Sequence, residues 1–306
     1  MAKILVTGGA GFIGSNLADR LIAEGHDVVI VDNLSTGFRE NINKKAKFYE
    51  IDIRDKKIAE IFAKEKPDFV NHHAAQVDVR KSLEDPAYDA DVNILGSLNI
   101  LENCRKYNVR KIIYVSTAGA IYGEPEYLPV NEKHPVNPIS HYGVSKHTVE
   151  HYLFLYNYLY KLNFTVLRYP NVYGPRQSPR GEAGVNAIFI RKMLRGETPV
   201  IYGDGEQLRD YIYVDDIVEA NIFALTKGDK GFYNIGSGIG VSVNQIYSTL
   251  QKIIGFSEKP KYAAARPGEI NKIFIDGSLA RKELEWYPKV FFEEGLRKTV
   301  DKFSNK

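Results

Sequence analysis

The sequence predicts an α/β protein built on a doubly wound parallel sheet, with a smaller lobe interleaved into its second half. Three observations support this. Short apolar runs alternate with longer helical patterns over the first two-thirds of the chain. A glycine-rich segment joins the first run to the first helix, and prolines and glycines become frequent after Tyr169. Such alternation is typical of a parallel sheet with helices on both faces.

The order of these patterns predicts the domain organisation. The expected strands lie at 4–6, 28–31, 48–51, 69–70, 112–115 and 165–167, and the expected helices near 12–24, 55–64, 86–107 and 141–161. We expect residues 1–169 to form the first domain and residues 170–306 mainly to form the second lobe. Part of 212–236 regains strand and helix character, which predicts that it rejoins the first domain.

Composition excludes several classes of protein. The formal net charge of the 306 residues is +3, too small to indicate a nucleic-acid partner. The single cysteine, Cys104, excludes an internal disulfide and a multi-cysteine zinc site. We find no leader-like start and no apolar run long enough to span a bilayer, so we expect a soluble cytoplasmic protein without a membrane partner.

Glycines at positions 8, 11 and 14 follow the first expected strand and open the first helix. Gly8 permits a tight turn, Gly11 lets the backbone approach a pyrophosphate, and Gly14 lets the helix pack closely on the strand. A second strand follows this helix, so the segment predicts a Rossmann-type dinucleotide-binding domain. Phe12 and Ile13 belong to the same predicted cofactor site.

Acidic residues end the next two expected strands. Asp32 lies about 20 residues beyond the glycines, where a carboxylate binds the ribose hydroxyls of adenosine. It would repel a 2′-phosphate, so NAD is favoured over NADP. Asn33 belongs to the same site, although Asp32 and Asn33 together could also form only a turn. Asp52 and Ile53 are suited to the adenine edge, but aspartates that end strands are common.

Tyr142 and Lys146 are the candidate catalytic pair. Their spacing of four residues places both side chains on one helix face. A phenol ordinarily ionises near pH 10, and a neighbouring ammonium with an oxidised nicotinamide favours the phenolate and lowers its pKa. Tyr142 could then take a proton from a sugar hydroxyl. The chain has 20 tyrosines, so this pair carries weight only after a dinucleotide motif.

The glycine motif, the Tyr142–Lys146 pair and the segment 169–174 (YPNVYG) together resemble the extended short-chain dehydrogenase/reductase family over nearly the whole chain. The resemblance implies NAD as cofactor and Lys146 as a ligand of the nicotinamide ribose. It also implies an isomerase that inverts C4 of a UDP-hexose through a transient 4-keto sugar. UDP-glucose and UDP-galactose are the expected substrates, and N-acetylated forms are possible ones.

In this family a Ser or Thr hydroxyl completes the catalytic triad. Counting back from Tyr122-Gly123, the usual position holds Ala118, which departs from the family pattern. A one-residue bulge would bring Thr117 into place, so we predict Thr117 as the hydroxyl, with Ser116 as the second candidate. The alternative is that both hydroxyls only bond the backbone.

The resemblance also assigns the remaining cofactor residues. His72 and His73 are adjacent, so they point to opposite sides of a strand and cannot easily share an ion, and we predict no metal cofactor. The resemblance instead places His73, Ala74 and Ala75 along the cofactor, with Asn93 supporting this loop. Tyr169 completes the implied cofactor set.

Two arginines, Arg209 and Arg266, match the diphosphate-binding arginines of the family, and arginine suits phosphate through its two-pronged guanidinium. Taken singly, each arginine is as often a surface residue. Ile273 lies where a bulkier tyrosine can crowd the C2 substituent of the sugar, so N-acetyl groups could fit. The other substrate positions implied by the resemblance are Asn171, Val200, Tyr202 and Glu269.

Other reactions use the same fold. A sugar-nucleotide 4,6-dehydratase would have Asp-Glu after the catalytic threonine, whereas Ala118 and Gly119 follow Thr117 here. Epimerisation or decarboxylation of a UDP-uronate remains an alternative, and a non-catalytic NAD sensor is an alternative of another class. The helices near 86–107 and 141–161 are the usual dimer surface of the family, and the second is rich in aromatic residues, so we expect a homodimer.

Overall fold

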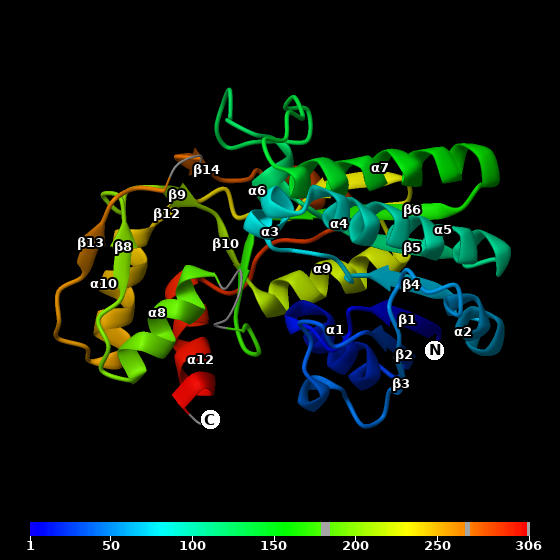
Figure 1. Cartoon of the computed structure of the whole chain (residues 1–306), viewed down its shortest axis with the longest axis horizontal. Helices are drawn as coiled ribbons and strands as arrows, with labels where there is room; N and C mark the ends of the chain where they lie inside the picture. The colour runs from blue at the N-terminus through cyan, green and yellow to red at the C-terminus, as the bar shows by residue number, and fades with distance from the viewer. Residues whose placement is uncertain (179–183, 267–269, 305–306) are drawn as a thin grey trace.

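The computed structural model describes residues 1–178, 184–266 and 270–304. Within these residues, a seven-stranded parallel sheet has the strand order β11-β6-β5-β4-β1-β2-β3 (Figure 1). The strands are β1 (Lys3–Thr7), β2 (Asp27–Asp32), β3 (Lys47–Glu50), β4 (Phe69–His72), β5 (Lys111–Thr117), β6 (Asn163–Tyr169) and β11 (Gly231–Asn234). The predicted doubly wound α/β fold is confirmed.

Separate helical layers cover the two faces of this sheet. Alternate residues of a strand point to opposite faces, and accordingly Ile4 and Leu5 belong to different hydrophobic cores. The core that contains Ile4 lies under α1 (Phe12–Ala23) and α9 (Val214–Thr226). The core that contains Leu5 lies under α2 (Ile58–Glu65), α5 (Gly96–Lys106) and α7 (His141–Tyr160) (Figure 1).

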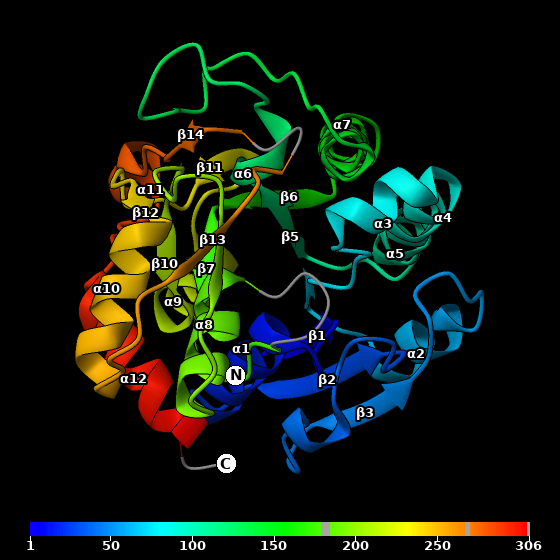
Figure 2. The same cartoon turned by 60° about the vertical axis from the view of Figure 1, so that its left-hand side comes forward.

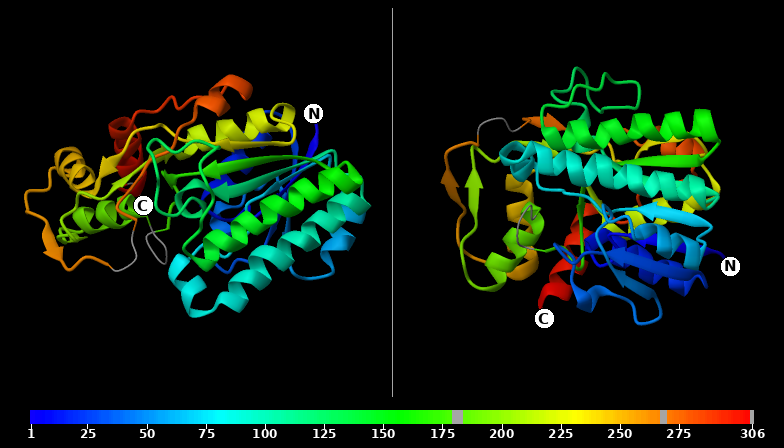
Figure 3. Two further views of the ribbon diagram at one scale, coloured as in Figure 1. Left: turned by 90° about the horizontal axis from the view of Figure 1, so that it is seen from above. Right: turned by 45° about the vertical axis from the view of Figure 1, so that its right-hand side comes forward.

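The stretch expected as one helix near 86–107 has three parts. These are α4 (Pro86–Ala90), a π-helical turn η2 (Asp91–Leu95) and α5. A π turn inserts one residue into the helical repeat and is frequent at functional sites. Here the turn contains Asn93, whose amide is buried against the loop after β4. Figure 3 shows α7 running beside this segment.

The second lobe is built from short strands and longer helices (Figure 2). One pair joins β8 (Val200–Tyr202) to β13 (Lys261–Ala263), and a three-stranded sheet joins β12 (Val241–Ser242), β9 (Leu208–Arg209) and β14 (Lys272–Ile273). Helices α8 (Val185–Leu194), α10 (Val243–Ile254) and α12 (Phe292–Ser304) pack against one another. The remaining short helices are η1 (Arg39–Asn41), α3 (Val79–Glu84), α6 (Ala118–Ile121) and α11 (Ser278–Glu283).

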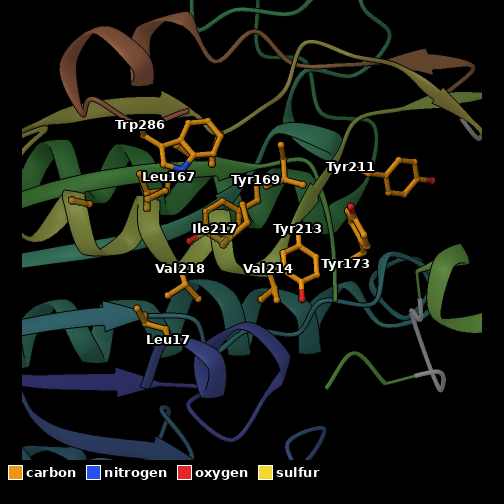
Figure 4. Close-up of a cluster of buried hydrophobic side chains, with 14 of the residues drawn as sticks. Leu17, Leu167, Tyr169, Tyr173, Tyr211, Tyr213, Val214, Ile217, Val218 and Trp286 are labelled. Carbon is orange, nitrogen blue, oxygen red and sulfur yellow. The ribbon is translucent and has the colours of Figure 1, made fainter. Parts of the chain in front are cut away.

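A buried aromatic cluster joins the two lobes (Figure 4). Strands β7 (Asn171–Tyr173) and β10 (Tyr211–Tyr213) pair in parallel and bring Tyr173 within 5.7 Å of Tyr213, ring centre to ring centre. Trp286 is fully buried, and its indole donates to the carbonyl oxygen of Asp216 at 2.8 Å in α9. Segments from both halves of the chain therefore share one core.

The Cys104 side chain is buried in α5. Among the described residues, no helix is both long enough and apolar enough to cross a membrane.

Candidate active site

The glycine-rich turn joins β1 to α1. In the sheet, β1 lies beside β4, and the strand order reverses at this point, which is where α/β proteins bind ligands. Gly8 has a φ of +68°, and a Cβ there would lie 2.7 Å from the amide nitrogen of Ala74. A Cβ at Gly14 would lie 2.3 Å from the carbonyl oxygen of Gly8. Backbone therefore occupies the space that side chains would need, which fits a cradle for a pyrophosphate.

The Asp32 carboxylate holds this turn from β2. One oxygen accepts from the Ala10 amide at 3.0 Å and the other from the Leu34 amide at 2.8 Å. Burial raises the pKa of Asp32 more than these two bonds lower it. The predicted ribose-binding residue thus also fixes the loop that would hold the diphosphate. Asn33 follows it and donates to Asp52 at 2.8 Å.

Asp52 is oriented by a residue that sequence reasoning missed. Arg54 donates to both oxygens of Asp52 and also to Asp91, and its hydrogen bonds lower the pKa of Asp52 to about 2. The side chain of Ile53 is 5% exposed and packs against Gly96. Its side chain therefore belongs to the core, which leaves mainly backbone at this position for a cofactor.

The two adjacent histidines have separate environments. His72 is bonded through Nδ1 to Thr7 at 2.6 Å and through Nε2 to Ser97 at 2.9 Å. The Nε2 atom of His73 is buried and has no hydrogen-bond partner within the described part of the chain. Burial, and then the charge of Lys146, lower the pKa of His73 to about 3. A neutral buried imidazole with an unused nitrogen fits a position along a cofactor.

The loop after His73, which contains Ala74 and Ala75, is tied to the catalytic helix through Asn93. Its amide accepts from the backbone nitrogen of Gln76 at 2.8 Å and donates to the Gln76 carbonyl at 3.0 Å. It also lies 3.1 Å from the hydroxyl of Ser145 in α7. These bonds give the π turn a clear structural role, because they align the loop after β4 with the helix that contains Tyr142.

Helix α7 starts at the site, and Tyr142 lies in its first turn. Ser140 caps the helix by accepting from the Gly143 amide at 3.1 Å, and Ser82 of α3 accepts from the Tyr142 amide at 3.2 Å. A Cβ at Gly143 would lie 2.4 Å from the carbonyl oxygen of Ala120. Glycine therefore lets α7 approach α6, the single turn that follows Thr117.

Lys146 lies one turn further along and is 4% exposed. Its ammonium nitrogen is 4.3 Å from the ring centre of Tyr114 in β5. Burial lowers the pKa of Lys146 to about 7, and the negative charges of Glu150 and Asp89 oppose this shift. The ammonium is thus held by packing beneath the Tyr142 turn, where an anionic ligand would favour its charged form.

Thr117 and Ser116 differ in orientation at the end of β5. Thr117 is half-buried, whereas the Ser116 hydroxyl is buried on the α7 side near Glu150. A Cβ built on Gly119 would lie 3.9 Å from the Thr117 hydroxyl and 3.8 Å from the Asn171 amide oxygen. The structure therefore brings Thr117 and Asn171 to the same space above Gly119.

The chain's relatives identify the family to which this arrangement belongs. Residues 4–236 match the NAD dependent epimerase/dehydratase family. The chain belongs to this family. A putative UDP-glucose 4-epimerase from Methanocaldococcus jannaschii is 49% identical over 302 residues, which cover 99% of this chain and 98% of the relative. Extended short-chain dehydrogenase/reductase character, predicted from the motifs, is thereby confirmed.

Solved structures of family members share the whole fold. The crystal structure of UDP-glucose 4-epimerase with UDP-glucose from Thermotoga maritima has a TM-score of 0.98 and 50% identity, with 99% of both chains covered. The Thermus thermophilus UDP-glucose 4-epimerase complex with NAD has a TM-score of 0.94 and 44% identity, with 98% of both chains covered.

On the second lobe, four of the predicted substrate residues lie in β8 or β9 or contact one of these strands. The guanidinium carbon of Arg266 is 3.9 Å from the ring centre of Tyr202, which ends β8, the strand that begins at Val200. Arg209, in β9, donates to the carbonyl oxygens of Leu208 at 2.8 Å and Asn271 at 3.2 Å. Glu269 lies outside the described residues.

Two predicted site residues have buried side chains. Ile273 is 2% exposed within an apolar cluster that includes Ala118, so little of its surface is left for a sugar substituent. The described part of the chain therefore shows no open space beside Ile273 that would support the expectation of room for an N-acetyl group. Tyr169 is also buried, and its hydroxyl accepts from Asn221 at 2.6 Å in α9, which leaves its backbone for a ligand.

A buried ion pair behind the catalytic helix was not anticipated. Arg168 of β6 donates to Glu150 of α7 through two nitrogens, at 3.0 and 2.6 Å, and to the Tyr122 hydroxyl at 2.9 Å. Glu150 is four residues beyond Lys146, and Arg168 interrupts an apolar strand. A charged residue in each of these two apolar patterns could have predicted the ion pair from the sequence, because buried charges require partners.

Proposed function

We propose that this chain is an NAD-dependent epimerase that inverts C4 of a UDP-hexose and interconverts UDP-glucose with UDP-galactose. The observation that carries the proposal is the position of Tyr142 and Lys146. They lie on the first turns of α7, which packs on the turn after Thr117 and is bonded, through Asn93, to the loop beside the glycine cradle. The names of the relatives over the full chain length support the same reaction.

The cofactor in this proposal is NAD, the cofactor of the family and of the Thermus thermophilus complex. The glycine turn would hold its diphosphate, Asp32 its adenosine ribose and Lys146 its nicotinamide ribose. His73 and the amides after it would lie along its length. When bound, NAD supplies the acceptor and donor of the hydride at C4.

The chain's own residues then handle protons and position. Tyr142 removes the proton from the 4-hydroxyl and returns it after the 4-keto sugar has turned, and the Lys146 ammonium favours the phenolate form. Thr117 and Asn171, which share the space above Gly119, would hold the sugar oxygen. Ala118 is buried and carries no acid, and Gly119 has no side chain, so the site lacks the acid–base pair that a 4,6-dehydratase needs.

The nucleotide half of the substrate would bind to the second lobe. Arg209 and Arg266 provide guanidinium groups for the diphosphate, and the Arg266–Tyr202 stack provides a flat face for the base. Anchoring through the nucleotide leaves the hexose free to rotate between two orientations, which epimerisation requires. Turnover of UDP-N-acetylhexosamines is the less supported part of the proposal, because Ile273 is buried.

A substrate panel tests this function. Purified protein is incubated with UDP-, dTDP- and GDP-hexoses and with UDP-glucuronate, and products are identified by NMR. We expect conversion of UDP-glucose to UDP-galactose without accumulation of reduced cofactor at 340 nm. Tyr142→Phe should abolish conversion while the melting temperature is retained. Full turnover by Tyr142→Phe, or preferential turnover of the uronate, would contradict the proposal.

We also propose a cytoplasmic homodimer formed through α5 and α7. Helical spacing places Val144, Leu155 and Leu159 on one face of α7, and these apolar side chains are 47%, 41% and 52% exposed. An apolar surface of this kind in a protein of this size indicates a partner. Light scattering at micromolar concentration should give twice the mass of the chain, and Leu159→Asp should give the mass of one chain.

A further inference from the structure

Two imidazoles converge on the outer face of α7, away from the site described above. His147 and His151 are four residues apart, and their Nε2 atoms are 3.0 Å apart. Two imidazole nitrogens that bind one ion at about 2.0–2.1 Å each, as neighbouring ligands, lie about 3 Å from each other. Without metal this contact is an imidazole–imidazole hydrogen bond, and its length is close to the spacing that one shared transition-metal ion imposes.

A carboxylate fixes the orientation of the first imidazole. The Nδ1 atom of His147 lies 3.0 Å from Glu150 Oε2, and Glu150 is in turn held by Arg168. The Arg168 guanidinium donates to both oxygens of Glu150. The Glu150 oxygen that faces His147 therefore acts as an acceptor, so Nδ1 of His147 carries the hydrogen and its Nε2 keeps a lone pair on the side of His151. Carboxylate–histidine pairs of this type orient metal ligands in proteins.

The histidine pair lies at the protein surface. His151 is exposed, and the pair borders a surface pocket lined by Phe154, Phe232 and Leu279. This pocket lies on the β11 side of α7. On its other side, α7 contacts α5 through the bond from Tyr156 to Glu102. The proposed dimer surface, which includes α5, would therefore lie on the side of α7 away from this pocket.

We propose that His147 and His151 form an accessory site for one divalent transition-metal ion that prefers imidazole, such as Zn²⁺, Ni²⁺ or Cu²⁺. Among the described residues, no group of three or more His, Cys, Asp or Glu side chains is arranged to hold an ion. The site thus has two protein ligands, and water completes the coordination. A bound ion would brace the α7 turn that follows Lys146, and it takes no part in the reaction.

Binding of the metal alone tests the site. Untagged protein with its cofactor content unchanged is titrated with ZnCl₂ and NiCl₂ by calorimetry, and we expect one ion per chain. His151→Gln removes one of the two protein ligands and should weaken binding at least 10-fold, since losing even a residue that only orients a ligand typically costs on the order of 10–100-fold. His26→Gln is the matched control, because it removes an imidazole from the turn between α1 and β2 and should leave the affinity unchanged.

Spectroscopy distinguishes this site from weak binding elsewhere. The electron paramagnetic resonance spectrum of one equivalent of Cu²⁺ should show coupling to two nitrogens in the parent protein and lose it in His151→Gln. His151 is exposed, so this variant should keep the parent melting temperature without metal. The proposal is overturned if the parent binds no ion, or if His151→Gln binds Zn²⁺ and Ni²⁺ as tightly as the parent.

Discussion

Replacing Glu150 by glutamine should destabilise this protein far more than a typical substitution. The side chain keeps its shape but loses the charge that pairs with Arg168, and the two residues are only 2% and 5% exposed. Removing one partner of a buried ion pair costs about 3–5 kcal/mol, because the other charge stays buried without compensation. We expect Glu150→Gln to lower the free energy of unfolding by about 3–4 kcal/mol.

The pKa of Glu150 indicates the same direction of effect and how it depends on pH. It is lowered from 4.5 to about 2, because hydrogen bonds from His147 and Arg168 outweigh the effect of burial. Because each pKa unit corresponds to about 1.4 kcal/mol, a lowering of this size stabilises the fold by a few kcal/mol, on the order of the cost expected for breaking the pair. A depressed carboxyl pKa stabilises the fold above pH 4.5, and this contribution is lost as the pH falls towards 2.

Urea unfolding of the parent and of Glu150→Gln at pH 7 and pH 3 measures both effects. The deficit of the variant should be largest at pH 7 and smaller at pH 3. The double variant Glu150→Leu with Arg168→Met should recover most of the loss, because no charge is then left unpaired. Glu24→Gln breaks an exposed pair with Arg20 and should cost less than about 1 kcal/mol. A Glu150→Gln deficit below 1 kcal/mol, or one that does not change with pH, would refute this reasoning.

Three further substitutions test the site. Gly14→Ala places a methyl 2.3 Å from the Gly8 carbonyl oxygen, so NAD affinity measured by calorimetry should fall at least tenfold. Asn93→Ala removes the buried bonds to Gln76, and urea unfolding should show a loss of about 2–3 kcal/mol. Lys146→Met should abolish turnover yet stabilise the cofactor-free protein. Burial lowers the pKa of Lys146 from 10.5 to about 7. The buried ammonium therefore destabilises the fold fully below pH 7, and this destabilisation decreases as the pH rises towards 10.5. For Lys146→Met, urea unfolding should show a free energy of unfolding about 2–3 kcal/mol higher than that of the parent at pH 6.5, and a smaller increase at pH 9.5. This value allows for the loss of the favourable contact between the ammonium and Tyr114.

Regular elements were predictable wherever the residue pattern itself expresses the geometry. The expected strand at 4–6 became β1 (Lys3–Thr7), and the expected helix at 141–161 became α7 (His141–Tyr160). A buried parallel strand is a continuous apolar run, and a helix repeats every 3.6 residues, so a short window contains the full signal. The glycine cradle was predictable for the same reason, since the three positions belong to one turn.

Contacts that join distant segments were not predictable from one sequence. Arg54 reaches Asp91 in η2, and Ser82 reaches the first turn of α7 from a helix about 60 residues earlier. The residues around Asn93 have a helical pattern throughout, yet the structure has a π turn there. The contact that accompanies this turn is with the distant loop at Gln76, so the local sequence does not reveal it. The family resemblance placed Ile273 beside the sugar, but only the structure shows that Ile273 shares a buried apolar cluster with Ala118.

These distant contacts have one consequence for the proposed mechanism. Tyr142 and Lys146 sit on a helix whose start is fixed at Ser82 and Ala120, and whose third turn is fixed by Glu150 to β6. A base must stay within hydrogen-bond reach of a hydroxyl that arrives from either orientation of the sugar. The ligand therefore has to move while the base stays fixed, and the buried ion pair keeps α7 fixed during that movement. Under conditions where Glu150→Gln is fully folded, its turnover should therefore still be lower than that of the parent protein.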